Sequence, residues 1–196
     1  RDTIAIANNP LLQRYLEERS DANLDLLTRS FVALSNAKPL YDQVRWIDET
    51  GRERVRVDQK PDGAQAVTAT ALQDKSDRYY FKDALRLPAG SIYVSPLDLN
   101  VEHGVVQVPY KPMLRIATPV FDAQGRPRGI SIINYRAQAL IDEWRATVAG
   151  IAGHAYLLNA EGHYLHNPND RLEWGFLFNR DHTLARSHPA VWQRMG

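Results

Sequence analysis

Residues 113–135 contain two apolar runs, and a short polar segment divides this stretch into two arms. The arms, residues 114–121 and 129–135, are rich in Ile, Val, Thr, Phe and Tyr, which favour half-buried strands. Between them lies Asp122-Ala-Gln-Gly125. Asp at the first position and Gly three residues later favour a type I turn followed by a bulge. The pattern predicts a β-hairpin.

The same turn spacing recurs at two other places in the chain. Asp48-Glu-Thr-Gly51 and Asn159-Ala-Glu-Gly162 each lie between two short segments of alternating or apolar character. Each therefore predicts a further hairpin. The predicted arms are residues 44–48, 53–57, 154–158 and 163–166.

Residues 1–36 have apolar side chains at the spacing of a helix, so this region is predicted to be a long N-terminal helix. Pro10 predicts a kink or a break near Asn8-Asn9. The polar stretch 17–23 is either a second interruption or an exposed face. Without a break, the helix would be roughly 50 Å long.

The remaining segments complete an α+β pattern. Helices are predicted at residues 77–87 and 137–148, a strand at 91–95, and loops at 59–73 and 96–112. Two strands, helices and three strands is the order of a PAS-like antiparallel five-stranded sheet with flanking helices. The third hairpin then begins a second PAS-like module, which we expect to be incomplete because the aromatic residues of the tail need cover. The expected domains are residues 1–36, 37–148 and 149–196.

Composition narrows the possible functions. The chain has 196 residues, 44% of them hydrophobic, and 24 basic residues balance 23 acidic ones, so a nucleic-acid-binding protein is not expected. Cysteine is absent, which excludes disulfides and thiol catalysis. No apolar run reaches the roughly 18 residues that a membrane span needs. Because the chain starts at Arg1 without Met, we expect it to be an excised piece of a longer protein.

The sequence has no catalytic signature. It lacks G-x-S-x-G, a P-loop, H-E-x-x-H and a Gly-rich dinucleotide fingerprint, so neither an enzyme nor a cofactor is expected. The loop 98–103 contains acidic residues and His103 but too few alternating oxygen ligands for calcium. His163 and His166 have no third ligand fixed by their spacing, so zinc is not expected either.

Three stretches resemble the double Cache family, the tandem PAS-like extracytoplasmic sensor domains of bacterial histidine kinases, diguanylate cyclases and chemoreceptors. They are YDQVRWIDETGRERVRVD at residues 41–58, DRYYFKDAL at 77–85, and the long stretch 92–135. Together they cover the membrane-distal module of such a sensor. The resemblance implies a ligand pocket in this module and a membrane-proximal module after it.

In the amino-acid-binding branch of this family, an Arg-x-Trp-Tyr motif opens the pocket helix, a Tyr follows on the next strand, and an Asp lies on the last strand. The corresponding residues here are Arg78, Tyr80, Phe81, Tyr93 and Asn134. Because Asn134 replaces the Asp that binds an ammonium group, amino-acid specificity is not transferred. The resemblance implies a carboxylate or an uncharged polar ligand, since arginine can bind a carboxylate through two hydrogen bonds.

Other roles for these residues remain open. Arg78 is either the anchor of a pocket or a surface residue, and the three aromatic residues are core side chains that can also line a pocket. Asn134 lies in an apolar strand, so its amide needs a partner, either a ligand or the backbone. Arg115 is a secondary candidate. With a one-residue bulge at Gly125 it faces away from Asn134, and a slip of one residue reverses this.

The resemblance implies the periplasmic sensor region of a membrane-anchored receptor, with its output enzyme outside this chain. Ligand binding would shift a population of conformations and move the N-terminal helix. Four apolar residues on that helix suggest a homodimer in the full receptor: Leu24, Leu27, Phe31 and Leu34. The alternative is a protein-interaction module that has a vestigial pocket and responds to a periplasmic partner.

Overall fold

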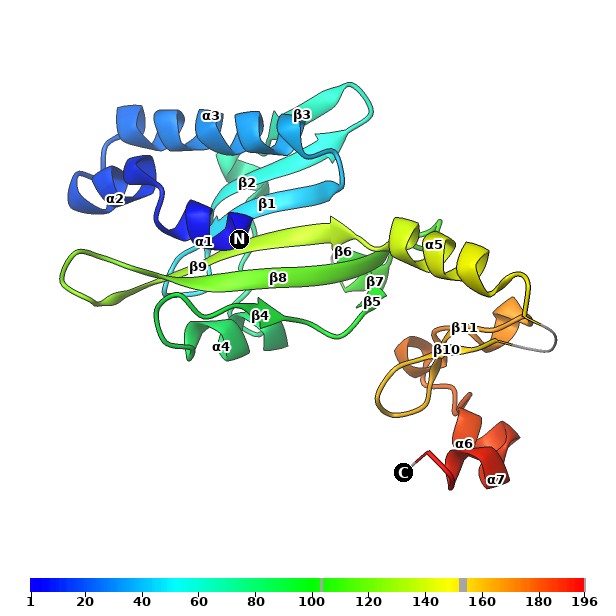
Figure 1. Cartoon of the computed structure of the whole chain (residues 1–196). Helices are drawn as coiled ribbons and strands as arrows, with labels where there is room; N and C mark the ends of the chain where they lie inside the picture. The colour runs from blue at the N-terminus through cyan, green and yellow to red at the C-terminus, as the bar shows by residue number, and fades with distance from the viewer. Residues whose placement is uncertain (103, 152–154, 196) are drawn as a thin grey trace. The chain divides into compact units, whose positions relative to one another are not determined.

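The computed structural model describes residues 1–102, 104–151 and 155–195. His103 and His154, which belong to segments considered above, lie outside the described residues. The chain has the expected mixed α+β architecture with helices at its N-terminus and an antiparallel sheet (Figure 1).

The chain folds into two compact units. Unit 1 is Arg1–Ser95 with Arg115–Tyr135, and unit 2 is Pro96–Leu114 with Arg136–Gly196. Residues 96–114 and 136–148, expected in the first PAS-like module, thus group with the C-terminal segment.

The N-terminal region is helical, but it is not one long helix. It consists of α1 (Asp2–Ala7), α2 (Pro10–Glu17) and α3 (Asp21–Ala37). Pro10 is the first residue of α2, and the Asn9 side chain caps that helix by accepting the amide of Leu11 at 2.8 Å. Ser20 caps α3. Both places where the sequence suggested an interruption are therefore breaks, and α3, with 17 residues, spans only about 25 Å.

In the described part of the chain, the main sheet contains seven strands rather than the expected five. Its path is β3-β2-β1-β9-β8-β4, and β5 also pairs with β8. The five expected strands are β1, β2, β4, β8 and β9, whereas β3 and β5 lie in segments predicted to be loops. The strands are β1 (Tyr41–Ile47), β2 (Glu53–Lys60), β3 (Gly63–Ala66), β4 (Tyr93–Val94), β5 (Asp98–Leu99), β8 (Pro112–Phe121) and β9 (Pro127–Arg136).

The three predicted hairpins are present, and their turns share one set of hydrogen bonds. The amides of Gly51, Gly125 and Gly162 donate to the carbonyl of the Asp or Asn three residues earlier, at 2.9–3.1 Å. In each turn the Asp or Asn side chain accepts the amide two residues later, at 3.0–3.1 Å. These are the bonds expected for an Asx residue that opens a turn.

Asp122 illustrates how strongly such a turn can hold a carboxylate. Burial favours its neutral form, but hydrogen bonds from the amide and side chain of Arg126, from the side chain of Arg128 and from the amide of Gln124 outweigh this. Together they lower the pKa of Asp122 to about 2. The central turn therefore contains an ionised side chain at any physiological pH.

Unit 1 has a core on each face of its sheet. Helices α1–α3 cover one face, and α4 (Tyr79–Leu85) covers the other (Figure 1). Strand β1 contributes to both, with Val44 and Trp46 on the α1–α3 face and Ile47 on the α4 face. The α1–α3 face buries Ile6, Ala7, Leu12, Tyr15, Leu27, Phe31, Val55, Val57, Val120 and Ile133, and the α4 face buries Tyr80, Phe81, Ala84, Ala117, Ile130 and Ile132.

The apolar residues of α3 that suggested a homodimer pack within unit 1. Leu27 and Phe31, two of the residues on which the dimer prediction relied, are buried in the core of unit 1, while Leu24 and Leu34 are partly buried against it. These side chains are therefore used within one copy. An exposed apolar position on the same helix is Leu26, at 42% of its accessible surface.

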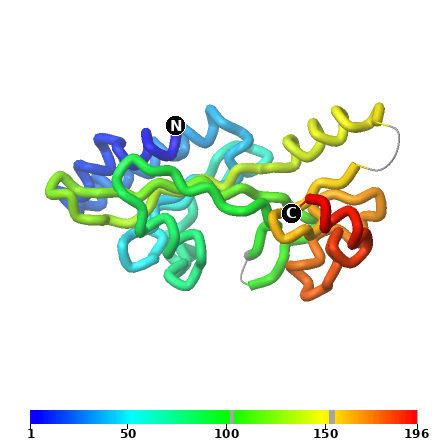
Figure 2. Tube along the Cα trace, turned by 60° about the horizontal axis from the view of Figure 1, so that its bottom comes forward, coloured from blue at the N-terminus to red at the C-terminus, as the bar shows by residue number. Residues whose placement is uncertain are grey.

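Unit 2 contains α5 (Gln138–Val148), which confirms the helix predicted at 137–148, and the third hairpin, β10–β11 (Figure 2). Its core gathers Leu99, Ile141, Leu165 and Trp174. The other elements of unit 2 are short: β6 (Val101–Glu102), β7 (Val105–Val106), β10 (Leu157–Leu158), β11 (Tyr164–His166), η2 (Asp170–Leu172), η3 (Gly175–Phe178), α6 (Leu184–Ser187) and α7 (Pro189–Trp192).

Candidate functional site

The α4 face of unit 1 gathers cationic side chains around one aromatic ring. Tyr80 on α4 is 2% exposed. Three guanidinium groups lie over its ring, with their central carbons 5.4 Å (Arg115), 5.7 Å (Arg78) and 5.8 Å (Arg45) from the centroid. Each of these distances is within the range of a cation–π interaction. This arrangement places three positive charges around Tyr80.

The start of α4 explains why these side chains meet. Arg78 is the N-cap residue of α4, and Tyr80 and Phe81 on its first turn point into the core of the α4 face. On the sheet, Tyr93 pairs with Ala117 and packs partly buried against the same core. Phe81 and Tyr93 thus act as core aromatics on the face where Arg78 and Tyr80 lie.

A chain of buried polar groups extends from this ring across the sheet. Arg45 donates through Nη1 to Glu53 Oε1 at 3.1 Å and through Nη2 to Asn134 Oδ1 at 2.6 Å. Asn134 in turn donates through Nδ2 to Gln43 Oε1 at 3.0 Å. Arg45, Glu53 and Asn134 are at most 2% exposed. Both ends of the Asn134 amide are therefore bonded within the protein, to side chains rather than to the backbone.

The carboxylate of Glu53 has further partners. Its Oε2 accepts the amide of Gln73 at 3.0 Å and lies 3.9 Å from Arg56 Nη1. Arg56 also forms a two-bond pair with Asp58, at 2.7 and 3.2 Å. Buried charges of this kind are stable only when they are paired and hydrogen-bonded, as they are here.

The charges around Tyr80 shift the pKa values of Tyr80 and Arg45. Burial would raise the pKa of Tyr80, but the charges of Arg45, Lys75 and Arg115 and a hydrogen bond from Arg45 outweigh it and lower the pKa. Burial likewise opposes the charged form of Arg45, but Tyr80 and Glu53 raise its pKa above the usual value. Arg45 therefore stays protonated, and the surroundings of Tyr80 favour negative charge.

All six residues that the sequence singled out lie on this face, including Arg115. The hydroxyls of Thr118 and Ser131 both bond to Thr3, on the α1–α3 face. Their neighbours Ala117 and Ile132 therefore face α4. Arg115 lies two residues from Ala117 and Asn134 two residues from Ile132, so both also face α4. Arg115 does not face away from Asn134, as a single bulge at the turn would require.

The reason for this change of face is a second irregularity in the hairpin. Gly129, within β9, has φ of +104°, a value that glycine adopts readily and that marks a bulge in a strand. A Cβ at this position would collide with the carbonyl oxygen of Ile47 on β1. Relative to a hairpin with the bulge at Gly125 alone, the irregularity at Gly129 shifts the alternation by one residue.

Sequence reasoning missed Arg45, Glu53 and Gln43. The only signal was Arg45 within the alternating segment Val44-Arg-Trp46, where a cation between two core residues has to face the other side of the sheet. Glu53 gave no signal, because a register shift between Trp46 and Ile47 changes the pairing of β1 with β2 close to it.

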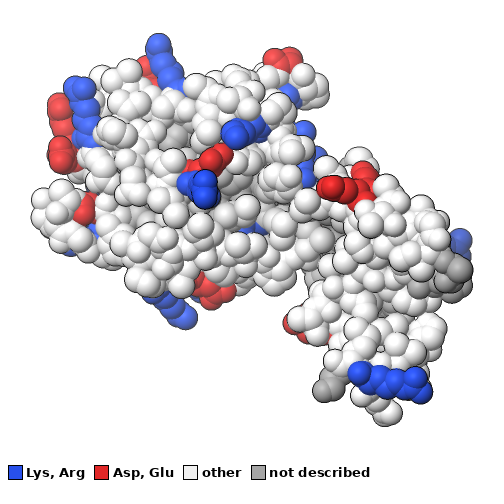
Figure 3. Space-filling view, in the orientation of Figure 1, with Lys and Arg blue, Asp and Glu red and all other residues white. Residues whose placement is uncertain are grey.

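Neither a metal site nor a membrane span is found in the described residues. They contain no group of three or more His, Asp or Glu side chains that could hold a metal ion. None of their helices is long and apolar enough to cross a bilayer. On the surface shown in Figure 3, basic and acidic side chains are interspersed, in keeping with the net charge of +1.

Comparisons with solved structures give close matches in fold. One is a domain of a sensory box/GGDEF family protein from Vibrio parahaemolyticus, with 25% identity and a TM-score of 0.82 over 98% of this chain and 73% of that one. Another is the extracellular domain of a protein described as the histidine kinase vpHK1S-Z8, with 25% identity and a TM-score of 0.81 over 98% and 69% of the two chains.

A more distant match is the ligand-binding domain of the amino-acid chemoreceptor PctC of Pseudomonas aeruginosa, solved with GABA. It has 18% identity and a TM-score of 0.59 over 95% of this chain and 70% of that one, so it supports the fold alone. No curated protein matches the sequence. The sequence model of the bacterial histidine kinase sensor domain matches residues 3–196. The chain therefore belongs to the bacterial histidine kinase sensor-domain family.

Proposed function

We propose that this chain is the periplasmic ligand-sensing region of a membrane-anchored receptor of the histidine kinase or diguanylate cyclase type, and that its ligand binds on the α4 face of unit 1. One observation carries the proposal. Three guanidinium groups surround Tyr80, and Glu53, the carboxylate bonded to one of them, is already engaged by Arg45 and by the backbone. Arg78, at the edge of this group, is the cation that an anionic ligand can reach.

Arg78 is the residue best placed to contact the ligand directly. It is partly exposed, and among the described residues its guanidinium touches the Tyr80 ring but forms no ion pair. Its hydrogen-bond donors match a planar carboxylate. Arg45, in contrast, is buried and bonded to Glu53 and Asn134, so it stabilises the site without contacting the ligand.

The same geometry disfavours a free α-amino acid. An ammonium group needs an acceptor or a carboxylate when it leaves water. Asn134 stands where the resemblance places that carboxylate, and its oxygen already accepts a bond from Arg45. We therefore propose an organic acid or an uncharged polar molecule as the ligand.

The signal would pass through the sheet of unit 1. Strands β8 and β9 carry Arg115 and Asn134 toward α4, and they also carry Thr118 and Ser131 toward Thr3 of α1. A ligand that binds one arrangement of these strands more tightly would shift the population toward it and move α1. In the full receptor we expect a homodimer through the exposed side of α3, which cysteine cross-linking in membranes would test.

Calorimetric titration of organic acids, polar neutral molecules and amino acids tests the ligand site. Arg78→Ala should weaken the binding of an acid by about 1.5–3 kcal/mol, roughly 10- to 150-fold. Arg86→Ala is the matched control, because Arg86 lies at the other end of the same helix. Equal affinities in wild type and Arg78→Ala would place Arg78 outside the site. Tight binding of free amino acids would contradict the assigned role of Asn134.

A second candidate function rests on the two internal hydrogen bonds of the Asn134 side chain. Because both ends of its amide are bonded internally, the α4 face could be a structural remnant, and the chain would then sense through a periplasmic protein partner. Failure of every small molecule to bind, together with capture of one specific partner through unit 1, would favour this alternative.

A further inference from the structure

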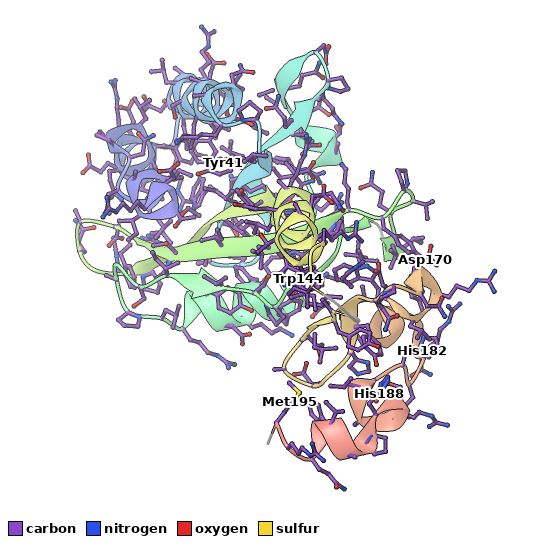
Figure 4. The ribbon with its side chains drawn as sticks, turned by 45° about the vertical axis from the view of Figure 1, so that its right-hand side comes forward. Tyr41, Trp144, Asp170, His182, His188 and Met195 are labelled. Atoms are coloured by element: carbon purple, nitrogen blue, oxygen red, sulfur yellow. The ribbon has the colours of Figure 1, made fainter. Side chains whose placement is uncertain are left out.

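Unit 2 contains a cavity of its own, separate from the α4 face of unit 1. Its volume is about 450 Å³, within the range of small-molecule sites. Tyr110, Trp174 and Phe178 supply aromatic walls, and the charged lining consists of Arg145, Asp170, Glu173, Arg171 and Arg180. Asp170, on η2, is labelled in Figure 4.

Glu173, one of the two acidic residues of the lining, already has partners within the protein. Glu173 Oε1 accepts the amide of Asn167 at 3.0 Å, lies 2.7 Å from His166 Nδ1 and is 3.7 Å from Arg145 Nη2. Arg145 is likewise engaged, since its Nε and Nη2 lie 3.2 and 3.0 Å from the same nitrogen of His166. Arg145 and Glu173 therefore form a closed polar group at one side of the cavity.

The two other arginines are not engaged in this way. Among the described residues, the guanidinium groups of Arg171 and Arg180 form no ion pair, and Arg180 lies over the Phe178 ring with its central carbon 5.6 Å from the centroid. Asp170 is the only other acid in the described lining. Arg145 is paired with Glu173 and, at 3.5 Å, with Asp142. The unpaired cations of the described lining are therefore Arg171 and Arg180, and they face Asp170. The cavity therefore favours an anion.

The aromatic walls restrict the shape of that anion. The rings of Tyr110 and Phe178 lie 5.7 Å apart between centroids and are tilted by 31°. Trp174 is 3% exposed and packs against Phe176 at 6.3 Å. Tyr110 and Phe178 are thus stacked on each other, and Tyr110, which is 50% exposed, offers an open ring surface to a planar ligand. A guanidinium next to this surface can bind a carboxylate on the edge of the ligand ring.

We propose that unit 2 holds a second ligand site, for an aromatic carboxylate. The ring of the ligand packs against the exposed ring of Tyr110, beside Phe178, and its carboxylate is bound by Arg171 and Arg180. This site is independent of the site on the α4 face, because it shares no residue with it.

The test uses benzoate as the probe and follows binding by calorimetry and by the indole NMR signal of Trp174. Two further probes separate its features: cyclohexanecarboxylate keeps the charge without the planar ring, and benzyl alcohol keeps the ring without the charge. We expect benzoate to bind at least several-fold more tightly than either. Equal binding of cyclohexanecarboxylate would overturn the aromatic part, and an absence of benzoate binding would overturn the site.

Variants then locate the bound probe. Arg171→Gln combined with Arg180→Gln should weaken benzoate binding at least about tenfold, since it removes charge-assisted hydrogen bonds. Arg186→Gln is the control, because Arg186 lies in the same unit, is exposed and pairs with Asp181 at 2.8 Å. An equal effect of the control would overturn the proposal. Loss of binding in Arg78→Ala with no loss in the double variant would place benzoate on the α4 face, which would overturn this second site and leave the first intact.

Discussion

Replacing Glu53 by alanine would remove the negative member of a fully buried ion pair. The side chains of Arg45 and Glu53 are 3% and 0% exposed, and the pair measures 3.1 Å. The substitution leaves the Arg45 charge without its carboxylate and the amide of Gln73 without its acceptor. Arg45 keeps its bond to Asn134 and its position over Tyr80.

The magnitude follows from this geometry. At 3.1 Å and an effective dielectric constant of about 20, the attraction between the two charges is about 5 kcal/mol. Removing one partner of a buried pair typically costs about 3–5 kcal/mol. Because Asn134 and Tyr80 still stabilise Arg45, the lower end of this range is the natural expectation. We therefore expect Glu53→Ala to reduce the free energy of unfolding of unit 1 by about 3 kcal/mol or more.

Urea titration followed by the indole NMR signal of Trp46 would measure this loss. Of the four tryptophans, Trp46 is the one in unit 1, and its indole nitrogen donates to the carbonyl of Arg128 at 3.1 Å. The signal therefore reports unit 1 without the other unit. Arg45→Met and the double variant complete a double-mutant cycle, in which the double variant should lose less than the sum of the singles.

An exposed ion pair provides the control. Arg29 and Asp25 on α3 lie 2.9 Å apart with side chains 76% and 57% exposed, and breaking such a pair changes stability by only about 0.2–1 kcal/mol. A loss below about 1 kcal/mol in Glu53→Ala would refute the reasoning, because it would mean that water replaces the missing carboxylate.

Two further variants test other parts of unit 1. Gly129→Ala should lower its thermal midpoint markedly, because a Cβ collides with the carbonyl of Ile47 at a backbone φ of +104°. Gly90→Ala, which has positive φ but open space around it, should cost much less. Burial and a hydrogen bond to Asp2 raise the pKa of Tyr41 to about 12. The neutral phenol thus contributes stability below pH 10 that is lost as the pH rises from 10 to 12. Tyr41→Phe should remove this dependence in urea titrations at several pH values, and an unchanged dependence would count against it.

The sequence predicted the parts of the fold that depend on neighbouring residues. The hairpins were found because each turn is encoded within a few residues, from Asp122 to Arg126 in the central case. Strand β3 was missed because Gly63-Ala-Gln-Ala66 is short and has no β-branched or aromatic residue, and it becomes a strand only by pairing with β2. Such pairing lies beyond any local pattern.

The candidate site was predicted only in part for the same reason. Arg78, Tyr80 and Phe81 lie close together in the sequence, and a resemblance could identify them as a group. Arg45 and Asn134 are 89 positions apart, and their bond depends on the register between β1 and β9. The face of Arg115 depended on Gly129, whose positive φ cannot be read from the residue type alone.

The two edges of the main sheet have a consequence for association between copies. One edge is β3, with four residues, and the other is formed by β4 and β5, with two residues each, so either offers only a few backbone groups to a strand of another copy. Short edges of this kind disfavour strand addition and aggregation. Concentrated solutions of the folded chain should therefore resist polymerisation by strand addition at the edges of this sheet.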